Sequence, residues 1–279
     1  MKADRVRKVA DLANRRTRER FGRFLIEGPQ SVREAVTWMP DAVRDLYVQA
    51  VDGPDGPRIA GETLTSIVER SQEHRIYVHP ASEAVMRRIS PDCQGIAAVG
   101  DADAVRATAQ GTQLPDKPFV AAFWQVRDPG NAGTVIRAAD AAGCDAVVFV
   151  DDCVDMLNPK VIRATAGSLF HIPVMTMGVD KFFGWAGEKV LRTVAADVYG
   201  TDGREPRELP EALRDQDLAG MGKAVIFGNE ARGLEPGLLG RCDDIVRIPL
   251  YGKAESLNLA TSAAIMLMSM AMSSHIGTM

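Results

Sequence analysis

From residue 119 onward, nearly continuous apolar segments alternate with segments of helical composition. The apolar segments are expected to form strands at 119–126, 146–150, 171–175, 190–196, 224–228 and 244–250. Helices are expected between or after them, at 131–142, 158–168 and 257–273. Apolar runs without in-and-out alternation are typical of strands buried on both faces of a parallel sheet. This region therefore predicts an α/β fold, in which ligands gather outside the carboxyl ends of the strands.

The first hundred residues show a shorter alternation of strands and helices, which is typical of a smaller α/β domain. A basic helix is followed there by the strand-like "FLIEG" and by a helix near 31–38, for which Ser31 is a candidate N-cap. The polar stretch 104–117 separates this region from the apolar "FVAAFWQV". We therefore predict an N-terminal domain over 1–103, a linker over 104–117 and a C-terminal domain over 118–279.

Composition places the chain among globular proteins, because 46% of its 279 residues are hydrophobic and can fill an ordinary core. No uncharged apolar run reaches the ~18 residues of a membrane span, and the N-terminus is too polar for a signal peptide. We therefore expect a cytoplasmic protein with no membrane partner. The four cysteines and four histidines are scattered without ligand spacing, so reduced thiols and no metal site are expected.

Positive charge is concentrated at one end of the chain, although the net charge is −4. Residues 1–23 contain nine Lys or Arg against three Asp or Glu. Such a segment can bind nucleic-acid phosphates, because the counterions released on binding add affinity. A solvated helix face is the alternative interpretation of this charge run. The candidate phosphate contacts are Arg15, Arg16, Arg18, Arg20 and Arg23.

The first loop whose residues could take part in binding or catalysis is "DPGNAGTVIRAADAAG", directly after the expected strand 119–126. Asn131 can cap the following helix or reach a ligand, and Gly133 permits a close approach to the helix start. Arg137 then stands on a helix lined mostly by alanines. The chain contains neither G-x-G-x-x-G nor a P-loop, so dinucleotide and nucleoside triphosphate enzymes remain only minor alternatives.

Two further loops follow later strands. In "VIFGNEARGL", Gly228 at the end of a strand allows a ligand to touch the backbone, and the Glu230 carboxylate can hold a hydroxyl or order the loop. In "IPLYGKAESLNLATSAAIMLMSM", Ser256 or Asn258 can cap the terminal helix. The methionines of that helix are expected to form one face for core or oligomer packing. They are Met266, Met268, Met270 and Met272.

Taken in order, the three loops resemble the TrmH/SpoU family of RNA ribose 2′-O-methyltransferases, within the SPOUT superfamily. The resemblance rests on N-x-G-x-x-x-R-x-A from Asn131, F-G-N-E-x-x-G-L from Phe227, and I-P-x-x-G-x-x-x-S-L-N from Ile248. The segment "NPKVIRATAGSLFHIPV" is also similar, and the resemblance covers about 118–279. More loosely, "RFGRFLIEGPQSVREA" and "CQGIAAV" resemble the L30e-like RNA-binding domain that many members carry.

The resemblance implies a C-terminal SPOUT-type knotted parallel sheet (an α/β trefoil knot) and a smaller N-terminal L30e-like α/β domain. It implies S-adenosylmethionine as the cofactor, bound in a bent form, and a homodimer formed through the C-terminal domain. The residues matched to cofactor binding are Gly228, Ile248, Leu250, Leu257 and Asn258.

The implied reaction is attack of a ribose 2′-oxygen on the activated methyl group, for which the protein must align the reactants. By resemblance, Arg137 is central to this reaction. Because a guanidinium keeps its proton in proteins, we favour a fixed cation that grips phosphate over a general base. The other candidate catalytic residues are Asn131, Glu230, Ser256 and Asn258.

The docking domain favours 23S ribosomal RNA as the target, with transfer RNA as an alternative substrate. The modification is then either a housekeeping one or one that protects ribosomes from an antibiotic. A catalytically silent RNA-binding or ribosome-associated protein of the same fold is the alternative from a different class.

Overall fold

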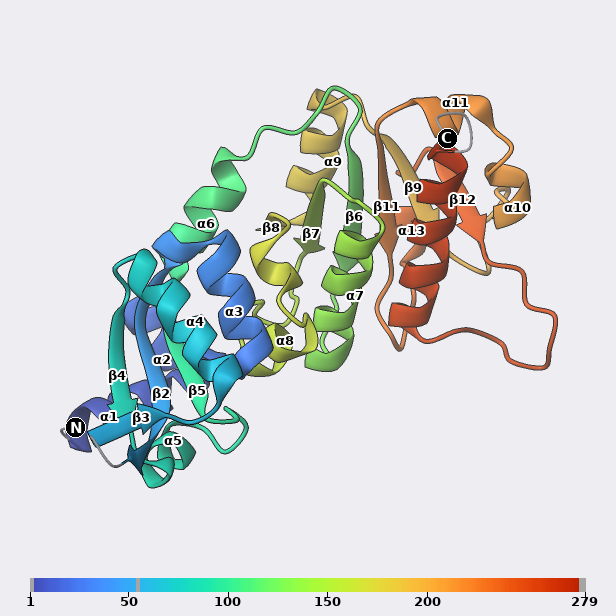
Figure 1. Ribbon diagram of the computed structural model, residues 1–279. Coiled ribbons are helices and arrows are strands. Elements are labelled where there is room, and N and C mark those ends of the chain that lie inside the picture. The colour runs from blue at the N-terminus through green and yellow to red at the C-terminus, as the bar shows by residue number, and fades with distance from the viewer. Residues whose placement is uncertain (1–2, 54–55, 276–279) are drawn as a thin grey trace. The chain divides into compact units, whose positions relative to one another are not determined.

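The structure, a computed structural model, describes residues 3–53 and 56–275 (Figure 1). Lys2 of the basic segment and the last four residues of the expected C-terminal domain lie outside the described residues. By packing, the chain divides into two compact units, Met1–Gln110 with Asp155–His171, and Gly111–Val154 with Ile172–Met279. No helix among the described residues is both long and apolar enough to span a bilayer.

The second unit is built on a seven-stranded sheet in which every pair of neighbouring strands is parallel. Its order is β10-β12-β9-β11-β6-β7-β8. The strands are β6 (Phe119–Trp124), β7 (Ala146–Val150), β8 (Val174–Met177), β9 (Arg192–Ala196), β10 (Arg207–Glu208), β11 (Lys223–Phe227) and β12 (Asp244–Arg247). The chain extends from β6 toward β8 and later fills the sheet on the other side of β6. The order therefore reverses at β6, the kind of switch point where α/β sheets bind ligands.

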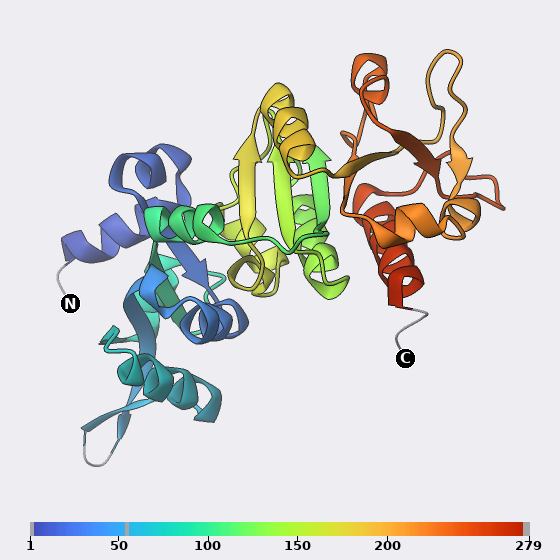
Figure 2. The same cartoon turned by 90° about the horizontal axis from the view of Figure 1, so that it is seen from above.

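Helices cover both faces of this sheet, as the continuous apolar strands predict. On one face, α9 and α12 pack on β6, β7 and β11, whereas α7 and α13 pack against each other on the opposite face. Figure 2 shows α9 in gold and α7 in green on opposite sides of the strands. The helices of this unit are α7 (Pro129–Ala141), α9 (Val179–Glu188), α10 (Leu209–Ala212), α11 (Gln216–Gly220), α12 (Pro236–Leu239) and α13 (Leu259–His275).

Three local expectations for this unit need correction. The strand expected at 171–175 begins only at Val174, because a 3-10 turn, Ser168–Phe170, precedes it. Helix α9 was not expected, since Gly184 and Gly187 lower its helix propensity. The methionines of α13 do not share a face. Met266 and Met270 are buried, whereas Met268 and Met272 are exposed.

The first unit contains a mixed sheet in the order β1-β5-β2-β3, with β4 paired to β2. Its strands are β1 (Arg23–Glu27), β2 (Val43–Gly53), β3 (Gly56–Ile59), β4 (Tyr77–Ala81) and β5 (Ile96–Asp101). Its helices are α1 (Ala3–Ala10), α2 (Arg15–Phe21), α3 (Pro29–Trp38), α4 (Glu62–Glu73), α5 (Glu83–Ile89) and α8 (Pro159–Ala164), with short 3-10 turns at Asp11–Ala13 and Pro40–Ala42. Helix α3 begins at Pro29 rather than at Ser31, since Gly28 before it has a φ of 85°.

The structure departs from the predicted domain organisation in two respects, the extent of the linker and the packing of residues 155–171. Helix α6 (Ala102–Gly111) occupies the first half of residues 104–117, and only the second half lacks a helix or strand. Residues 155–171, expected within the C-terminal domain, pack with the first unit. The Arg163 guanidinium pairs there with Glu27 at 2.7 Å and with Asp92 at 2.9 Å. These long-range ion pairs have no signature in the local sequence.

Arg18 is the one candidate phosphate contact that the structure contradicts. Its side chain is only 4% exposed, and its Nε and one terminal nitrogen donate to the Asp155 carboxylate at 2.9 and 2.7 Å. The other terminal nitrogen donates to the carbonyls of Leu12 and Ala13 at 3.0 and 2.8 Å. Four of the five N–H groups of this buried guanidinium are engaged within the protein, so Arg18 is a structural residue.

Replacing Arg18 by alanine should lower the free energy of unfolding by about 3–5 kcal/mol, because it leaves Asp155 and two backbone carbonyls without their donor. Urea denaturation of the full chain measures this change. Arg16→Ala is the matched control, since Arg16 is exposed and should change stability by less than about 0.5 kcal/mol. Equal stability of the two variants would contradict the structural role of Arg18.

Candidate active site

A cavity of about 520 Å³ lies at the carboxyl ends of β9, β11 and β12, beside the start of α13. Six stretches of the chain frame it, at 196–200, 227–234, 236–239, 246–250, 256–259 and 262–266. All five predicted cofactor residues line this cavity: Gly228, Ile248, Leu250, Leu257 and Asn258. Two predicted catalytic residues, Glu230 and Ser256, also line it. The second and third motifs therefore meet, although β9 lies between β11 and β12.

A tight turn after β11 forms one wall of this cavity. Asn229 and Gly233 exchange two backbone hydrogen bonds, at 3.1 and 2.9 Å, so the chain folds back on itself within four residues. A Cβ atom on Gly228 would lie 2.3 Å from the carbonyl carbon of Gly233. Gly233 itself has a φ of 65°, which favours glycine. Both glycines of the second motif are therefore required by the backbone.

Side chains from the three motifs form one hydrogen-bonded chain, which we call the amide relay and which consists of Glu230, Asn131 and Asn258. The Asn131 Nδ2 donates to Glu230 Oε1 at 3.3 Å, and the Asn258 Nδ2 donates to Asn131 Oδ1 at 3.2 Å. Asn258 also caps α13, because its Oδ1 accepts from the backbone N–H of Ala260 at 2.8 Å. The relay thus joins the starts of α7 and α13 to the loop after β11.

Asp128, which the sequence argument did not single out, is the cap of α7. Its Oδ1 accepts from the backbone N–H of Asn131 at 2.7 Å. The Asn131 side chain is consequently available for the relay instead of capping the helix. The signal for this arrangement was present, since Asp directly before Pro129 is a typical start of a helix.

Gln125 is a second residue that sequence reasoning missed. It follows β6 with a φ of 52°, and its carbonyl accepts from Asn229 Nδ2 at 2.7 Å. Its side-chain Oε1 accepts from the Arg232 guanidinium at 2.9 Å. Gln125 therefore fixes the turn that carries Glu230. A left-handed backbone at a glutamine leaves no signal in a single sequence.

Arg137 does not line the cavity of its own chain. It lies six residues beyond Asn131, about 9 Å along the axis of α7, on the solvent-exposed side of the helix with Gly130 and Thr134. Among the residues that the structure describes, its guanidinium has no hydrogen-bond or ion-pair partner. The structure therefore brings together Asn131 and all seven candidates that line the cavity, but it leaves Arg137 outside this group.

The remaining reactive groups do not point to other chemistry. Burial raises the pKa of Cys153 to about 11 and that of Cys242 to about 12, so these thiols stay protonated at neutral pH. Within the described ranges, no group of three His, Cys, Asp or Glu could hold a metal ion. The cavity offers backbone polar groups, apolar side chains such as Leu239 and Met266, and the amide relay. A cavity of this size with mixed apolar and polar lining can hold and orient a small molecule.

The parallel sheet, the glycine turn and the cavity among the motif loops define a methyltransferase domain of the SPOUT type, preceded by a smaller α/β unit. The profile of the SpoU rRNA Methylase family matches residues 118–268, and the profile of the MRM3-like substrate binding domain matches residues 3–98. The chain belongs to the SpoU rRNA methylase family.

Relatives of known name resemble the chain over nearly its whole length. It is 35% identical to a 23S rRNA (guanosine(2553)-2′-O)-methyltransferase of Bacillus subtilis, over 95% of each chain. A solved RNA 2′-O ribose methyltransferase is 26% identical, with a TM-score of 0.73 over 97% of this chain and 96% of that one. An AdoMet-bound rRNA methyltransferase from Sinorhizobium meliloti, 24% identical, shares the fold, with a TM-score of 0.77 over 99% and 96%.

Two substitutions of Asn258 should separate its capping role from its link to Asn131. Asn258→Ala removes the cap and should lower the free energy of unfolding by about 1 kcal/mol, whereas Asn258→Asp keeps the cap and should cost less. Both remove the donor to Asn131, so amide hydrogen exchange in 228–233 should accelerate in both. Equal losses of stability would contradict the cap, and unchanged exchange would contradict the relay.

Proposed function

We propose that the protein transfers a methyl group from S-adenosylmethionine to a ribose 2′-hydroxyl of 23S ribosomal RNA. The observation that carries this proposal is the amide relay, which ties all three motif loops together beside a cavity of suitable size. The relative from Bacillus subtilis, matched from end to end, carries this activity in its name. The action on ribosomal RNA supports the cytoplasm as the place of action.

The residues around the cavity fit the cofactor. The close backbone at Gly228 and the segments at Ile248 and Leu250 present polar main-chain groups, while Leu257 and Met266 supply apolar surface for an adenine ring. When bound, S-adenosylmethionine supplies a methyl group that is already activated for displacement. The chain's own task is to orient this group and the ribose, for which Ser256 and the amide relay are placed at the cavity edge.

Arg137 is assigned as a fixed cation rather than a base. An exposed guanidinium without a carboxylate partner keeps its full charge for an RNA phosphate and for negative charge that develops on the 2′-oxygen. Because a guanidinium does not release its proton, the proton of the 2′-hydroxyl must leave to another acceptor. The exposed neighbours of Arg137 on α7, Thr134 and Ala141, are small and leave room for the sugar-phosphate backbone beside this cation.

A homodimer accounts for the position of Arg137 outside its own cavity. Helix α13 exposes an apolar stripe of Ile265, Met268 and Met272, and α7 packs directly beside α13. Burial of this stripe against a second copy would stabilise a dimer through the C-terminal domain. We assign Arg137 to the cavity of the second protomer.

The N-terminal domain, residues 1–103, is assigned to RNA docking. Arg16 and Arg20 are exposed on α2, and Arg15 and Arg23 are also accessible, although each pairs with an acid, Glu19 and Asp101 respectively. These cations position the RNA backbone without reading its sequence. The catalytic domain then comprises residues 118–279.

Incubation with labelled S-adenosylmethionine and undermodified 23S and transfer RNA should place one 2′-O-methyl group on the 23S RNA, mapped by mass spectrometry. Arg137→Ala and Arg137→Lys should each lower the rate about 100-fold or more, because neither offers the forked cation. Calorimetric titration should give unchanged cofactor affinity for both variants. No methylation of any RNA by the unaltered chain would favour the silent RNA-binding alternative, and full rates in both variants would remove Arg137 from the reaction.

A purified heterodimer of two inactive chains should test the assignment of Arg137 to the second protomer. One chain carries Arg137→Ala and the other Leu257→Arg, which fills the cavity. If each site takes its arginine from the second copy, one of two sites is intact and about half of the activity returns. Each homodimer is the control and should be inactive. An inactive heterodimer would mean that Arg137 serves its own chain, and a monomeric mass by light scattering would contradict the dimer itself.

A further inference from the structure

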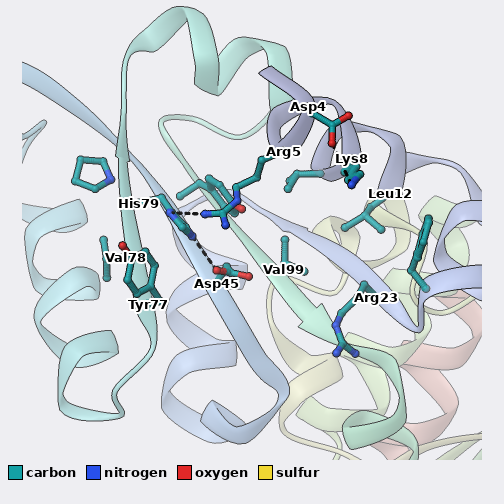
Figure 3. Close-up of a pocket in the computed structure, with 14 residues that line it drawn as sticks. Asp4, Arg5, Lys8, Leu12, Arg23, Asp45, Tyr77, Val78, His79 and Val99 are labelled. Atoms are coloured by element: carbon teal, nitrogen blue, oxygen red, sulfur yellow. Dashed lines mark hydrogen bonds and ion pairs between the residues drawn. The ribbon is translucent and has the colours of Figure 1, made fainter. Parts of the chain in front are cut away.

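A second cavity, of about 870 Å³, lies within the first unit between α1 and the sheet (Figure 3). Helix α1 contributes Arg5 and Lys8, whereas the opposite wall comes from β2 and β4. Aromatic and cationic side chains therefore face the same space. Neither the motifs nor the cavity beside α13 accounts for this combination.

Three neighbouring aromatic rings form the wall on the side of the sheet, two of them stacked and the outermost tilted by 58°. His79 lies parallel to Tyr47, with ring centroids 4.6 Å apart and planes at 19°, and Tyr77 lies against His79 at 4.5 Å. Tyr47 is buried at the inner end, whereas Tyr77 is 66% exposed at the outer end. The Tyr77 ring is therefore held in place by His79 but left largely uncovered. An exposed aromatic ring of this kind is suited to stacking with a planar ligand.

A hydrogen-bonded chain positions a cation beside this wall. Figure 3 shows Arg5 and Asp45 on opposite sides of the His79 ring. The Arg5 guanidinium lies 3.5 Å from His79 Nδ1, and His79 Nε2 lies 2.8 Å from Asp45 Oδ1. Because a guanidinium can only donate, Nδ1 is the acceptor and the Nε2–H donates to Asp45. The His79 ring therefore links Arg5 to Asp45 through hydrogen bonds and holds the guanidinium beside the aromatic wall.

Arg5 is the cation of this cavity that remains available for a ligand. In the described part of the chain no carboxylate forms an ion pair with it, whereas Lys8 pairs with Asp4 at 3.0 Å and Arg23 with Asp101 at 2.9 Å. The Lys8–Asp4 pair is exposed on both sides and can exchange its partner easily. An anion at Arg5 would therefore gain Lys8 as a second contact.

We propose that this cavity binds an unpaired RNA nucleotide, with its base stacked on Tyr77 and its phosphate held by Arg5 and Lys8. A nucleotide combines a planar base and an anionic phosphate in one ligand, as the aromatic ring and the two cations of this cavity require. The nucleotide must be unpaired, because the faces of bases within a duplex are covered by their neighbours. This inference rests on the proposed function for the identity of the ligand as RNA.

Fluorescence anisotropy of the full chain with labelled oligouridylate and oligoadenylate of about ten nucleotides tests the site. Tyr77→Ala should weaken binding about 10-fold, whereas Tyr77→Phe should change it by less than about twofold, because the ring is kept. Arg5→Gln should also weaken binding, and it should reduce the slope of log K against log salt by about 0.7. The matched controls are Trp38→Ala and Arg88→Gln, which alter an exposed aromatic ring and an exposed cation elsewhere in the unit.

Location is tested by ultraviolet crosslinking of the same oligonucleotides with 4-thiouridine, followed by peptide mapping. Crosslinks are expected in the peptides that contain Tyr47 or Tyr77, and an RNA duplex should give none there. Binding that is insensitive to Tyr77→Ala, or crosslinks confined to other peptides, would overturn the proposal. Equal losses of oligonucleotide affinity in Tyr77→Ala and Tyr77→Phe would also overturn the proposal.

The outcome is independent of methyl transfer, since no cofactor is present in these measurements. Methylation of 23S RNA together with binding that ignores Tyr77 would remove the nucleotide site but leave the proposed function. Binding that depends on Tyr77 without methylation of any RNA would do the reverse. In the methylation assay, Tyr77→Ala should raise the KM for RNA about 10-fold and leave kcat unchanged.

Discussion

The candidate active site depends on the amide relay of Glu230, Asn131 and Asn258. Two of its hydrogen bonds join segments that are about a hundred residues apart in the chain. A neutral hydrogen bond contributes only about 1 kcal/mol to stability, and one to a carboxylate somewhat more. The amide relay matters for geometry rather than for stability. The parallel sheet brings the carboxyl ends of its strands to one edge, and the relay then fixes the positions of the loops relative to one another. Without it, the glycine turn would still be tied to Gln125, but the links through Asn131 and Asn258 between this turn and the starts of α7 and α13 would be lost.

Much of this arrangement could be predicted from the sequence. The central strands β6 and β7 are apolar throughout and β11 is apolar after Lys223, so their pattern indicates burial on both faces, and Asn258 stands where a helix cap is needed. Contacts between distant residues could not be predicted in this way. Arg18 belongs to a run of arginines, and only its partner Asp155, 137 positions away, removes it from solvent. The same holds for residues 155–171, whose packing on the first unit is set by ion pairs rather than by local pattern. The trefoil knot likewise remains a prediction from the family, since strand order alone does not describe threading.

The separation of Arg137 from the cavity has a physical advantage. A guanidinium inside an apolar pocket would need a carboxylate partner to offset its desolvation, and that partner would compete with RNA phosphate. On the exposed side of α7, the Arg137 guanidinium remains hydrated, and its charge has no carboxylate partner until a phosphate replaces the water. In the first unit, Arg5 likewise has no carboxylate ion-pair partner among the described residues, and it is held by the His79 ring, which Asp45 fixes from the other side.

Phosphate contacts and a base-stacking site would contribute different things to RNA recognition. In the proposed RNA complex, the exposed arginines of α2 would attract the RNA backbone, but successive phosphates would be equivalent to them, so the RNA could slide along this surface. A cavity that accepts one base on Tyr77 would select one of these equivalent positions of the RNA. Only an unpaired nucleotide in a particular place of a folded RNA can enter such a cavity. A methyltransferase that acts on one ribose of a large RNA needs such a fixed register more than it needs affinity. The aromatic wall of Tyr47, His79 and Tyr77 is therefore a better candidate for the origin of target selection than the more conspicuous run of basic residues.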